Sequence, residues 1–233
     1  MVGFSEILRR EADPVWRRIL GHSFLLEAAQ GTLPLEKFQY YLKQDHAYLF
    51  EYCRFLALAA SRSESLGHIH FFSEVLRSEF EFEMEMQRGL ATQVGLDAEE
   101  LAGATMAPTT KAYTSFLIKV AATEDLGGAL AALSPCPLSY VEIATSLAPS
   151  RRGIVAGDSA SRSSVEGAYD KWLEAYASSK SVEVCDKLRG LLDDVGQVVS
   201  ASQKDRMVRN FLDASRYEYM FWDMAYSMEK WSI

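Results

Sequence analysis

The chain has 233 residues, of which 48% are hydrophobic and 12% aromatic, enough to bury a substantial core in one large domain. Its 24 Lys and Arg against 32 Asp and Glu give a net charge of −8, which argues against nucleic acid as a partner because such binding needs clustered cations. No run approaches about 18 uninterrupted apolar residues and the charged first residues do not resemble a secretory signal, so we expect neither a membrane span nor export.

The hydrophobic pattern has the period of an α-helix almost throughout. An apolar face over 4–12 comes first, and Gly31 is suited to end a helix over 22–29. Pro34 is typical of the first turn of a long helix that we expect to reach about Ser61. Further helices are expected over 64–92, 98–101, 108–123, 126–147, 164–178, 181–198 and 201–231.

Alternating strand patterns bounded by Asn-Gly or Asp-Gly turns are absent. The sequence therefore predicts an all-α bundle of roughly eight to ten helices, forming a single domain over residues 1–233. The segment 149–164 is rich in Ser, Gly and Arg, and it predicts a mobile surface loop. It could instead be a domain linker, but the three helices that follow look too thin for a separate core.

The sequence Pro135-Cys136-Pro137 interrupts the apolar run that begins near residue 126. A proline in a helix interior costs about 3 kcal/mol, so this segment is either a helix start or a kink. The thiol of Cys136 therefore lies where the regular backbone is interrupted. These residues alone leave open whether the thiol is an ordinary buried cysteine or an accessible one.

The three cysteines, Cys53, Cys136 and Cys185, are widely spaced and form neither a disulfide framework nor a metal-binding pattern. They favour a reducing compartment, and we expect a cytoplasmic protein. The four histidines include no Glu-x-x-His pair of the kind that di-metal helical bundles use, so no metal site is predicted.

Several polar residues occur on aromatic helix faces. Asp45 shares a face with Tyr48, and a carboxylate buried there would need a partner or a shifted pKa; the alternative places Asp45 on the polar side. Glu218 has Phe221 and Trp222 at i+3 and i+4, a setting that raises the pKa of a carboxyl toward that of a general acid. The alternative is a solvated helix glutamate.

Two more spacings bear on the same question. Tyr140 lies four residues after Cys136, which places a phenol beside the thiol. Tyr169, Trp172 and Tyr176 are spaced three and four apart, which is typical of core packing.

Five ordered segments resemble the TenA family, the thiaminase II proteins. They are HSFL at 22–25 with GTLP at 31–34 and FQYYLKQDHAYL at 38–49, PTTKAYTS at 108–115, CPLSYVEI at 136–143, YDKWLEAY at 169–176, and EYMFW at 218–222. Together they cover nearly the full length of the chain, which is far more specific than any one of them alone.

The resemblance implies an all-α, haem-oxygenase-like fold without haem, usually assembled as a homotetramer and working without a cofactor. It also implies a hydrolase that cleaves a substituted aminopyrimidine, or thiamine itself, to hydroxymethylpyrimidine in thiamine salvage. The small aminopyrimidine or thiamine would be the partner of the site, with no nucleic acid or membrane involved.

The resemblance also assigns roles to residues of this chain. Cys136 matches the family's nucleophile, and Glu218 matches its acid–base glutamate. Asp45 matches the aspartate that binds the amino group and a ring nitrogen of the pyrimidine. The tyrosines that line the site and hold the catalytic groups match Tyr48, Tyr113, Tyr140 and Tyr176. Cys53 and Cys185 are expected to be structural.

The chain departs from the family pattern at two places. The segment after Glu142 is longer than expected, and 83–87 reads Glu-Met-Glu-Met-Gln where family members often carry a histidine. Two alternatives remain at this stage. One is a regulatory or ligand-binding bundle without catalysis, and the other is an oxygenase of the same fold, which would need a cluster of histidines and carboxylates.

Overall fold

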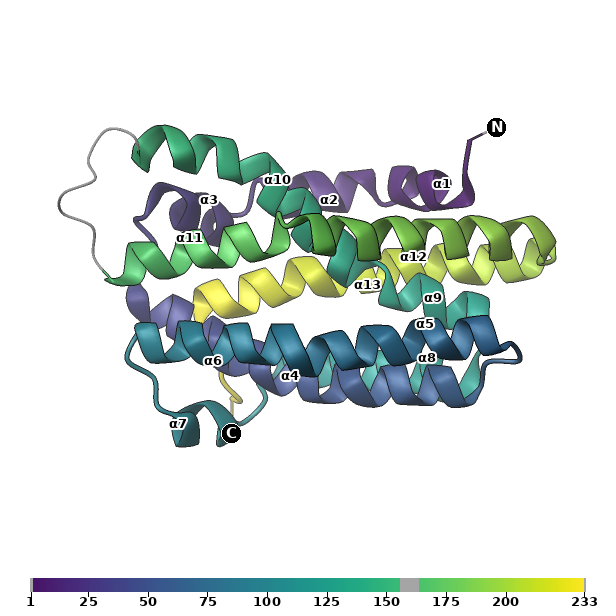
Figure 1. The fold of residues 1–233 in the computed structure, drawn as a ribbon, viewed down its shortest axis with the longest axis horizontal. Coiled ribbons are helices and arrows are strands. Elements are labelled where there is room, and N and C mark those ends of the chain that lie inside the picture. The colour runs from purple at the N-terminus through teal and green to yellow at the C-terminus, as the bar shows by residue number, and fades with distance from the viewer. Residues whose placement is uncertain (1, 156–163, 233) are drawn as a thin grey trace.

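The computed structural model describes residues 2–155 and 164–232, and the secondary structure of these residues is helical without strands (Figure 1). The all-α prediction is therefore confirmed. The first half contains α1 Phe4–Glu11, α2 Asp13–Leu20, α3 Ser23–Gln30, α4 Leu35–Ser61, α5 Leu66–Ser78, the π-helical turn η1 Glu79–Glu83, α6 Met84–Gln93, α7 Ala98–Ala102 and α8 Pro108–Thr123. The second half contains α9 Leu126–Leu133, α10 Pro135–Val155, α11 Ser164–Tyr176, α12 Ser179–Val198 and α13 Ala201–Ser227.

Local sequence signals explain many of the helix ends. Gly31 ends α3 in the left-handed conformation, with φ of 76°, which a residue without a Cβ adopts at little cost. Asp97 and Glu100 form a capping box at the start of α7. Ser200 and Gln203 form another at the start of α13.

The helix predicted over 126–147 is in fact two helices, α9 and α10, which meet at Ser134. Pro135 and Pro137 fall in the first turn of α10, where a missing backbone N–H costs little because helix N-termini leave those groups unpaired. The two prolines therefore separate two helices, and Cys136 lies between them at the new N-terminus.

The helix predicted over 64–92 is also interrupted. It begins at Leu66 and is broken by η1, a single π-helical turn, before it continues as α6. Such turns insert an extra residue, change the direction in which neighbouring side chains project, and often occur at functional sites. Together with α2, which the sequence did not indicate, these interruptions give the described residues more helices than predicted.

The prediction of a loop over 149–164 is wrong for the first part of this segment. The helix α10 continues to Val155, so 149–155 are helical. Residues 156–163 lie outside the described residues, and α11 begins at Ser164.

The long helix α13 lies between two groups of helices (Figure 1). It contacts α4 and α8 on one side and α2 and α10 on the other, it packs along α9, and α4 packs between α5 and α8. The buried side chains form one hydrophobic cluster that includes Trp16, Trp172 and Trp222. Among the described residues, no helix is long and apolar enough to cross a membrane.

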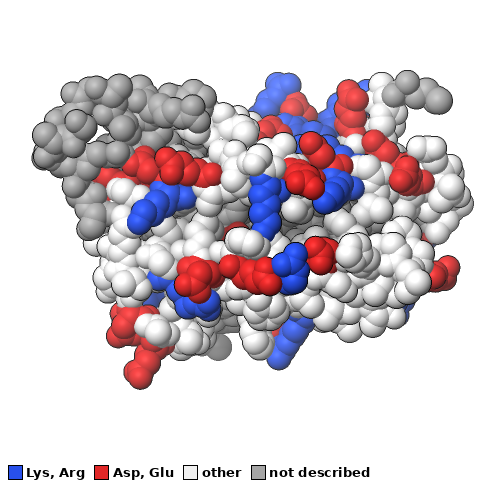
Figure 2. Space-filling view, in the orientation of Figure 1, with Lys and Arg blue, Asp and Glu red and all other residues white. Residues whose placement is uncertain are grey.

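Acidic and basic side chains alternate over the face shown in Figure 2. On α5 and η1, Arg77 pairs with Glu74 and with Glu81. Because these pairs are exposed, each contributes only about 0.2–1 kcal/mol to stability.

Candidate active site

A cavity of about 350 Å³ lies between α4, α5 with η1, α10, α11 and the start of α12. This size is within the range of small-molecule sites. Five of the seven predicted site residues line it, and they come from three different helices. These residues are Asp45, Tyr48, Cys136, Tyr140 and Tyr176.

The carboxylate of Asp45 is almost completely buried in the wall of this cavity. The hydroxyl of Tyr41 donates to Asp45 Oδ2 over 3.0 Å, and the side-chain amide of Gln87 donates to the same oxygen. Burial and the nearby negative charge of Glu83 raise the pKa of Asp45 well above its usual value, although these hydrogen bonds oppose the shift. The alternative position of Asp45 on the polar helix face is therefore excluded.

Tyr41 is held by aromatic side chains from four other helices, α3, α10, α11 and α13. Trp172 Nε1 donates to its hydroxyl over 3.2 Å, and the hydroxyl of Tyr140 lies 3.3 Å away. Since Tyr41 has a single proton, the bond to Asp45 leaves its oxygen free to accept from both neighbours. Tyr41 thus links Asp45 to the aromatic wall and fixes the orientation of the carboxylate.

Glu218 and Tyr113 form a buried pair directly behind this cavity. The hydroxyl of Tyr113 donates to Glu218 Oε1 over 2.6 Å, and Glu218 is 2% exposed. Burial raises the pKa of Glu218 to about 7, while the bond from Tyr113 lowers it. Glu218 is therefore not a solvated helix glutamate, and near neutral pH it can both give and accept a proton.

Cys136 is partly exposed in the cavity. Burial raises the pKa of its thiol well above the usual value, and the negative charge of Glu218 raises it further. The hydroxyl of Tyr48 favours the thiolate, but more weakly, since it makes no well-formed hydrogen bond. The resting thiol is consequently protonated at neutral pH and must lose its proton before it can act as a nucleophile.

The other two cysteines are more buried. Cys185 also lines the cavity, and its thiol donates to the backbone carbonyl of Pro137 over 3.4 Å. Burial raises the pKa of Cys185 to about 11 and that of Cys53 to about 12.

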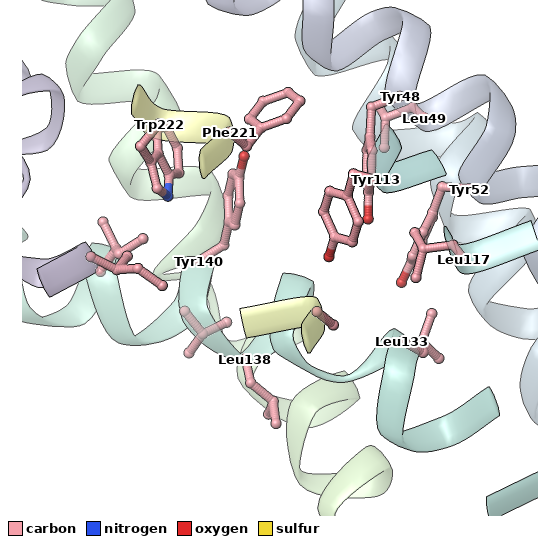
Figure 3. Packing of buried hydrophobic residues seen from close by; sticks show 14 of the residues in the cluster. Tyr48, Leu49, Tyr52, Tyr113, Leu117, Leu133, Leu138, Tyr140, Phe221 and Trp222 are labelled. Atoms are coloured by element: carbon pink, nitrogen blue, oxygen red, sulfur yellow. The ribbon is translucent and has the colours of Figure 1, made fainter. Parts of the chain in front are cut away.

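Figure 3 shows three of the predicted site tyrosines, Tyr48, Tyr113 and Tyr140, within the buried cluster. The rings of Tyr48 and Tyr113 lie side by side, with 5.2 Å between their centroids, and Tyr140 packs against Trp222. The ring of Tyr176 meets the ring of Tyr140 edge-on at 4.8 Å. The hydroxyl of Tyr48 is buried, and it lacks a hydrogen-bond partner in the part of the chain that the structure describes.

Sequence reasoning missed four residues that surround Asp45: Tyr41, Glu79, Glu83 and Gln87. Tyr41 lies one turn before Asp45 on the same face, a spacing that was available in the sequence. Gln87 lies within the segment where family members often carry a histidine, and its side-chain amide donates a hydrogen bond to Asp45. Glu79 and Glu83 are four residues apart but depend on the π-helical turn, which no sequence pattern announced.

Comparisons with known proteins identify the family and the fold. Residues 9–228 match the model of the TENA/THI-4/PQQC family. A protein of Halalkalibacterium halodurans named aminopyrimidine aminohydrolase is 35% identical over 99% of this chain and 99% of its own length. A solved structure described as a TenA homologue protein from P. horikoshii has a TM-score of 0.83 at 29% identity, covering 97% of this chain and 99% of that one.

A more distant structure bears on the fold alone. A domain of unknown function with a heme oxygenase-like fold, from Shewanella denitrificans, has a TM-score of 0.73 at 14% identity and covers 95% of this chain and 91% of that one. The expected haem-oxygenase-like fold is thereby confirmed.

Proposed function

This chain belongs to the TENA/THI-4/PQQC family, and we propose that it hydrolyses an aminomethyl-pyrimidine, or thiamine, to hydroxymethylpyrimidine in thiamine salvage. The name of the H. halodurans relative, aminopyrimidine aminohydrolase, supports this reaction. The observation that carries the proposal is that Cys136 and the buried Asp45 line one cavity, while the charge of the buried Glu218, whose pKa is raised to about 7, acts on the Cys136 thiol.

Asp45 recognises the pyrimidine. An aminopyrimidine presents an amino donor beside a ring nitrogen acceptor, and a carboxyl that carries a proton matches both. Burial raises the pKa of Asp45 and thereby favours this protonated form. Tyr41 and Gln87 hold Oδ2, so the carboxyl is oriented before the substrate arrives.

Cys136 acts as the nucleophile, and Glu218 transfers a proton from the Cys136 thiol to the pyrimidine ring. The carboxylate form of Glu218 accepts the proton of the Cys136 thiol, and the sulfur then bonds to an electron-poor ring carbon. The protonated Glu218 next donates to a ring nitrogen, which takes up the electron pair displaced by the sulfur. A pKa of about 7 suits both halves of this transfer.

Cleavage follows from the electron-rich adduct. The ring electrons form a double bond to the exocyclic methylene carbon, and the bond from that carbon to the leaving nitrogen breaks with its electron pair on nitrogen. Water then adds its hydroxyl to the methylene carbon, and the carbon–sulfur bond breaks to restore the aromatic ring and the thiol. The products are hydroxymethylpyrimidine and the free amine or thiazole.

A non-catalytic, regulatory role is not favoured, because the chain retains both Cys136 and Glu218 beside the buried Asp45. We further propose a homotetramer in the cytoplasm, as the family resemblance implies. Exposed apolar side chains on α4, α5 and η1, among them Phe50, Leu66 and Phe80, support contacts between copies, and all three cysteines are free thiols.

The experiment is to incubate the purified protein with aminomethyl-pyrimidine and with thiamine in parallel, and to follow hydroxymethylpyrimidine by chromatography. The proposal predicts product from at least one of the two compounds, at a rate proportional to the enzyme concentration. A protein that releases product from neither compound would contradict the proposed reaction.

A further inference from the structure

The π-helical turn brings two more carboxyl groups to the cavity, and the proposed chemistry gives neither of them a role. Glu79 and Glu83 both line it, and both are partly accessible from it. Burial and mutual repulsion with Glu83 and Asp45 raise the pKa of Glu79, while burial raises that of Glu83 to about 7. This wall of the cavity is therefore unusually rich in acidic groups.

Neither carboxyl has a basic partner among the described residues. Glu83 accepts a hydrogen bond from the hydroxyl of Tyr176, and Glu79 makes no hydrogen bond or ion pair within the described part of the chain. Lys180, the basic residue in the cavity lining, is placed over the ring of Phe82 instead. The exposed Glu81 of the same turn differs, because it is paired with Arg77.

A separate observation concerns a buried hydroxyl in the lining of this cavity. Tyr48 is 3% exposed and lines the cavity, yet its hydroxyl has no hydrogen-bond partner among the described residues. A buried hydroxyl left without a partner costs about 1–3 kcal/mol, so it calls for a partner from a bound molecule. The acidic wall and this hydroxyl thus belong to one ligand-binding space.

We propose that Glu79 and Glu83 form the subsite for the cationic leaving group of the substrate. An aminomethyl group is protonated at neutral pH, and the thiazolium of thiamine is permanently charged. In the low-dielectric cavity a cation next to these carboxyls relieves their repulsion and replaces the missing counter-charge. This inference rests on the proposed function. It identifies Glu79 and Glu83 as the residues that distinguish a charged substituent of the pyrimidine from a neutral one.

The cleavage chemistry predicts which kinetic constant depends on the subsite. The nitrogen leaves with the bonding electron pair, so its positive charge disappears as the bond breaks and an ammonium departs as neutral ammonia. The carboxyls therefore bind the ground state more strongly than the transition state, and their loss should raise KM more than it changes kcat. The neutral hydroxymethyl product gains little from them, which favours its release.

The test compares Glu83→Gln and Glu79→Gln with Glu81→Gln as a matched control. All three changes remove one potential negative charge from the same turn, but Glu81 faces Arg77 outside the cavity. Glutamine at position 83 can still accept from Tyr176, so the wall keeps its hydrogen bond. Thermal melts of each variant verify folding, and Glu83→Asp serves as a second, charge-retaining variant.

Binding is measured by calorimetry with Cys136→Ala added to every variant, which blocks turnover. The ligands are aminomethyl-pyrimidine, thiamine and the neutral hydroxymethylpyrimidine. We expect Glu83→Gln and Glu79→Gln to weaken the cationic ligands on the order of tenfold or more, as for a hydrogen bond to a charged group. The neutral ligand should change less than about threefold, and Glu83→Asp should retain part of the preference for the cation.

An equal loss for cationic and neutral ligands, no loss for either cation, or the same loss in Glu81→Gln would overturn the inference. Comparing the two cationic ligands shows whether the subsite binds the protonated amine, the thiazolium or both, since a subsite for the amine alone would leave thiamine affinity unchanged. Because binding is measured without turnover, a protein that binds these ligands selectively but hydrolyses neither would refute the proposed function and leave the subsite standing.

Discussion

The bond from Tyr113 to Glu218 offers a quantitative test of the proton pathway. Tyr113→Phe removes a single hydroxyl that donates to the carboxylate over 2.6 Å in a fully buried place. A hydrogen bond to a charged group contributes about 1.5–3 kcal/mol, and about 1.4 kcal/mol corresponds to one pKa unit. Since this bond lowers the pKa of Glu218, its loss should raise that pKa from about 7 by roughly one to two units.

The consequence appears in the pH dependence of the rate. The carboxylate of Glu218 must accept the thiol proton, so the acidic limb of kcat/KM should move to higher pH by the same one to two units. At pH 7 the rate should fall about 5- to 50-fold, and it should recover partly at alkaline pH. The assay is ammonia or hydroxymethylpyrimidine release between pH 5 and 10.

Tyr217→Phe is the control, because Tyr217 stacks on the ring of Tyr113 at 5.1 Å, whereas the hydroxyl that donates to Glu218 is that of Tyr113. It should leave the acidic limb in place. If the limb of Tyr113→Phe coincides with that of the wild type, Glu218 is not the group whose ionisation controls the reaction.

Three further predictions follow from buried polar contacts. Asp45→Asn should lower kcat/KM by about 2–3 kcal/mol of transition-state stabilisation, or roughly 30- to 150-fold, and unchanged steady-state kinetics would remove Asp45 from recognition. Glu218→Gln should slow turnover about 10²–10⁴-fold. Folding raises the pKa of Glu218 from 4.5 to about 7, so this acid stabilises the native state below its unfolded pKa and that contribution is lost as pH rises to about 7. The same variant should therefore be more stable than wild type at pH 8 by up to about 3 kcal/mol, with no such gain at pH 4 in denaturant titrations. Ser215→Ala removes the acceptor of Trp16 Nε1, which lies 2.9 Å away, and should cost about 1–3 kcal/mol of unfolding free energy without moving KM; a stability equal to wild type would show that the indole N–H finds another partner.

The sequence was sufficient for the helical class and for most helix ends. The 3.6-residue period and residues such as Gly31, Asp97 and Pro108 report local backbone preferences, and these do not depend on distant parts of the chain. The same reasoning failed over 64–92, because a smooth apolar pattern hides a π-helical turn. Over 126–147 the prolines marked an interruption, but the pattern left open whether it was a new helix or a kink. Propensity also failed for 149–155, where a Ser- and Arg-rich run continues an existing helix.

The site shows the same division between local and distant information. Spacing placed Asp45 beside Tyr48 and an aromatic face behind Glu218 but left open whether either carboxyl was solvated. In the structure both are buried. What spacing could not supply is which helices meet, since Tyr113 and Glu218 are 105 residues apart in the chain. The partners of Asp45 from α6 and the carboxyls of η1 likewise become visible only when the helices are packed.

The central claim is that the thiol of Cys136 carries the hydrolysis within a pocket that Asp45 and the tyrosines organise. The most direct measurement is the release of hydroxymethylpyrimidine by wild type, Cys136→Ser and Cys136→Ala, together with calorimetric binding of hydroxymethylpyrimidine to each. We predict that both variants lose turnover to the background rate, since a hydroxyl or methyl group cannot replace the thiol as a nucleophile, while their affinity for the product stays within about threefold of wild type. Turnover by Cys136→Ala at the wild-type rate would contradict the account.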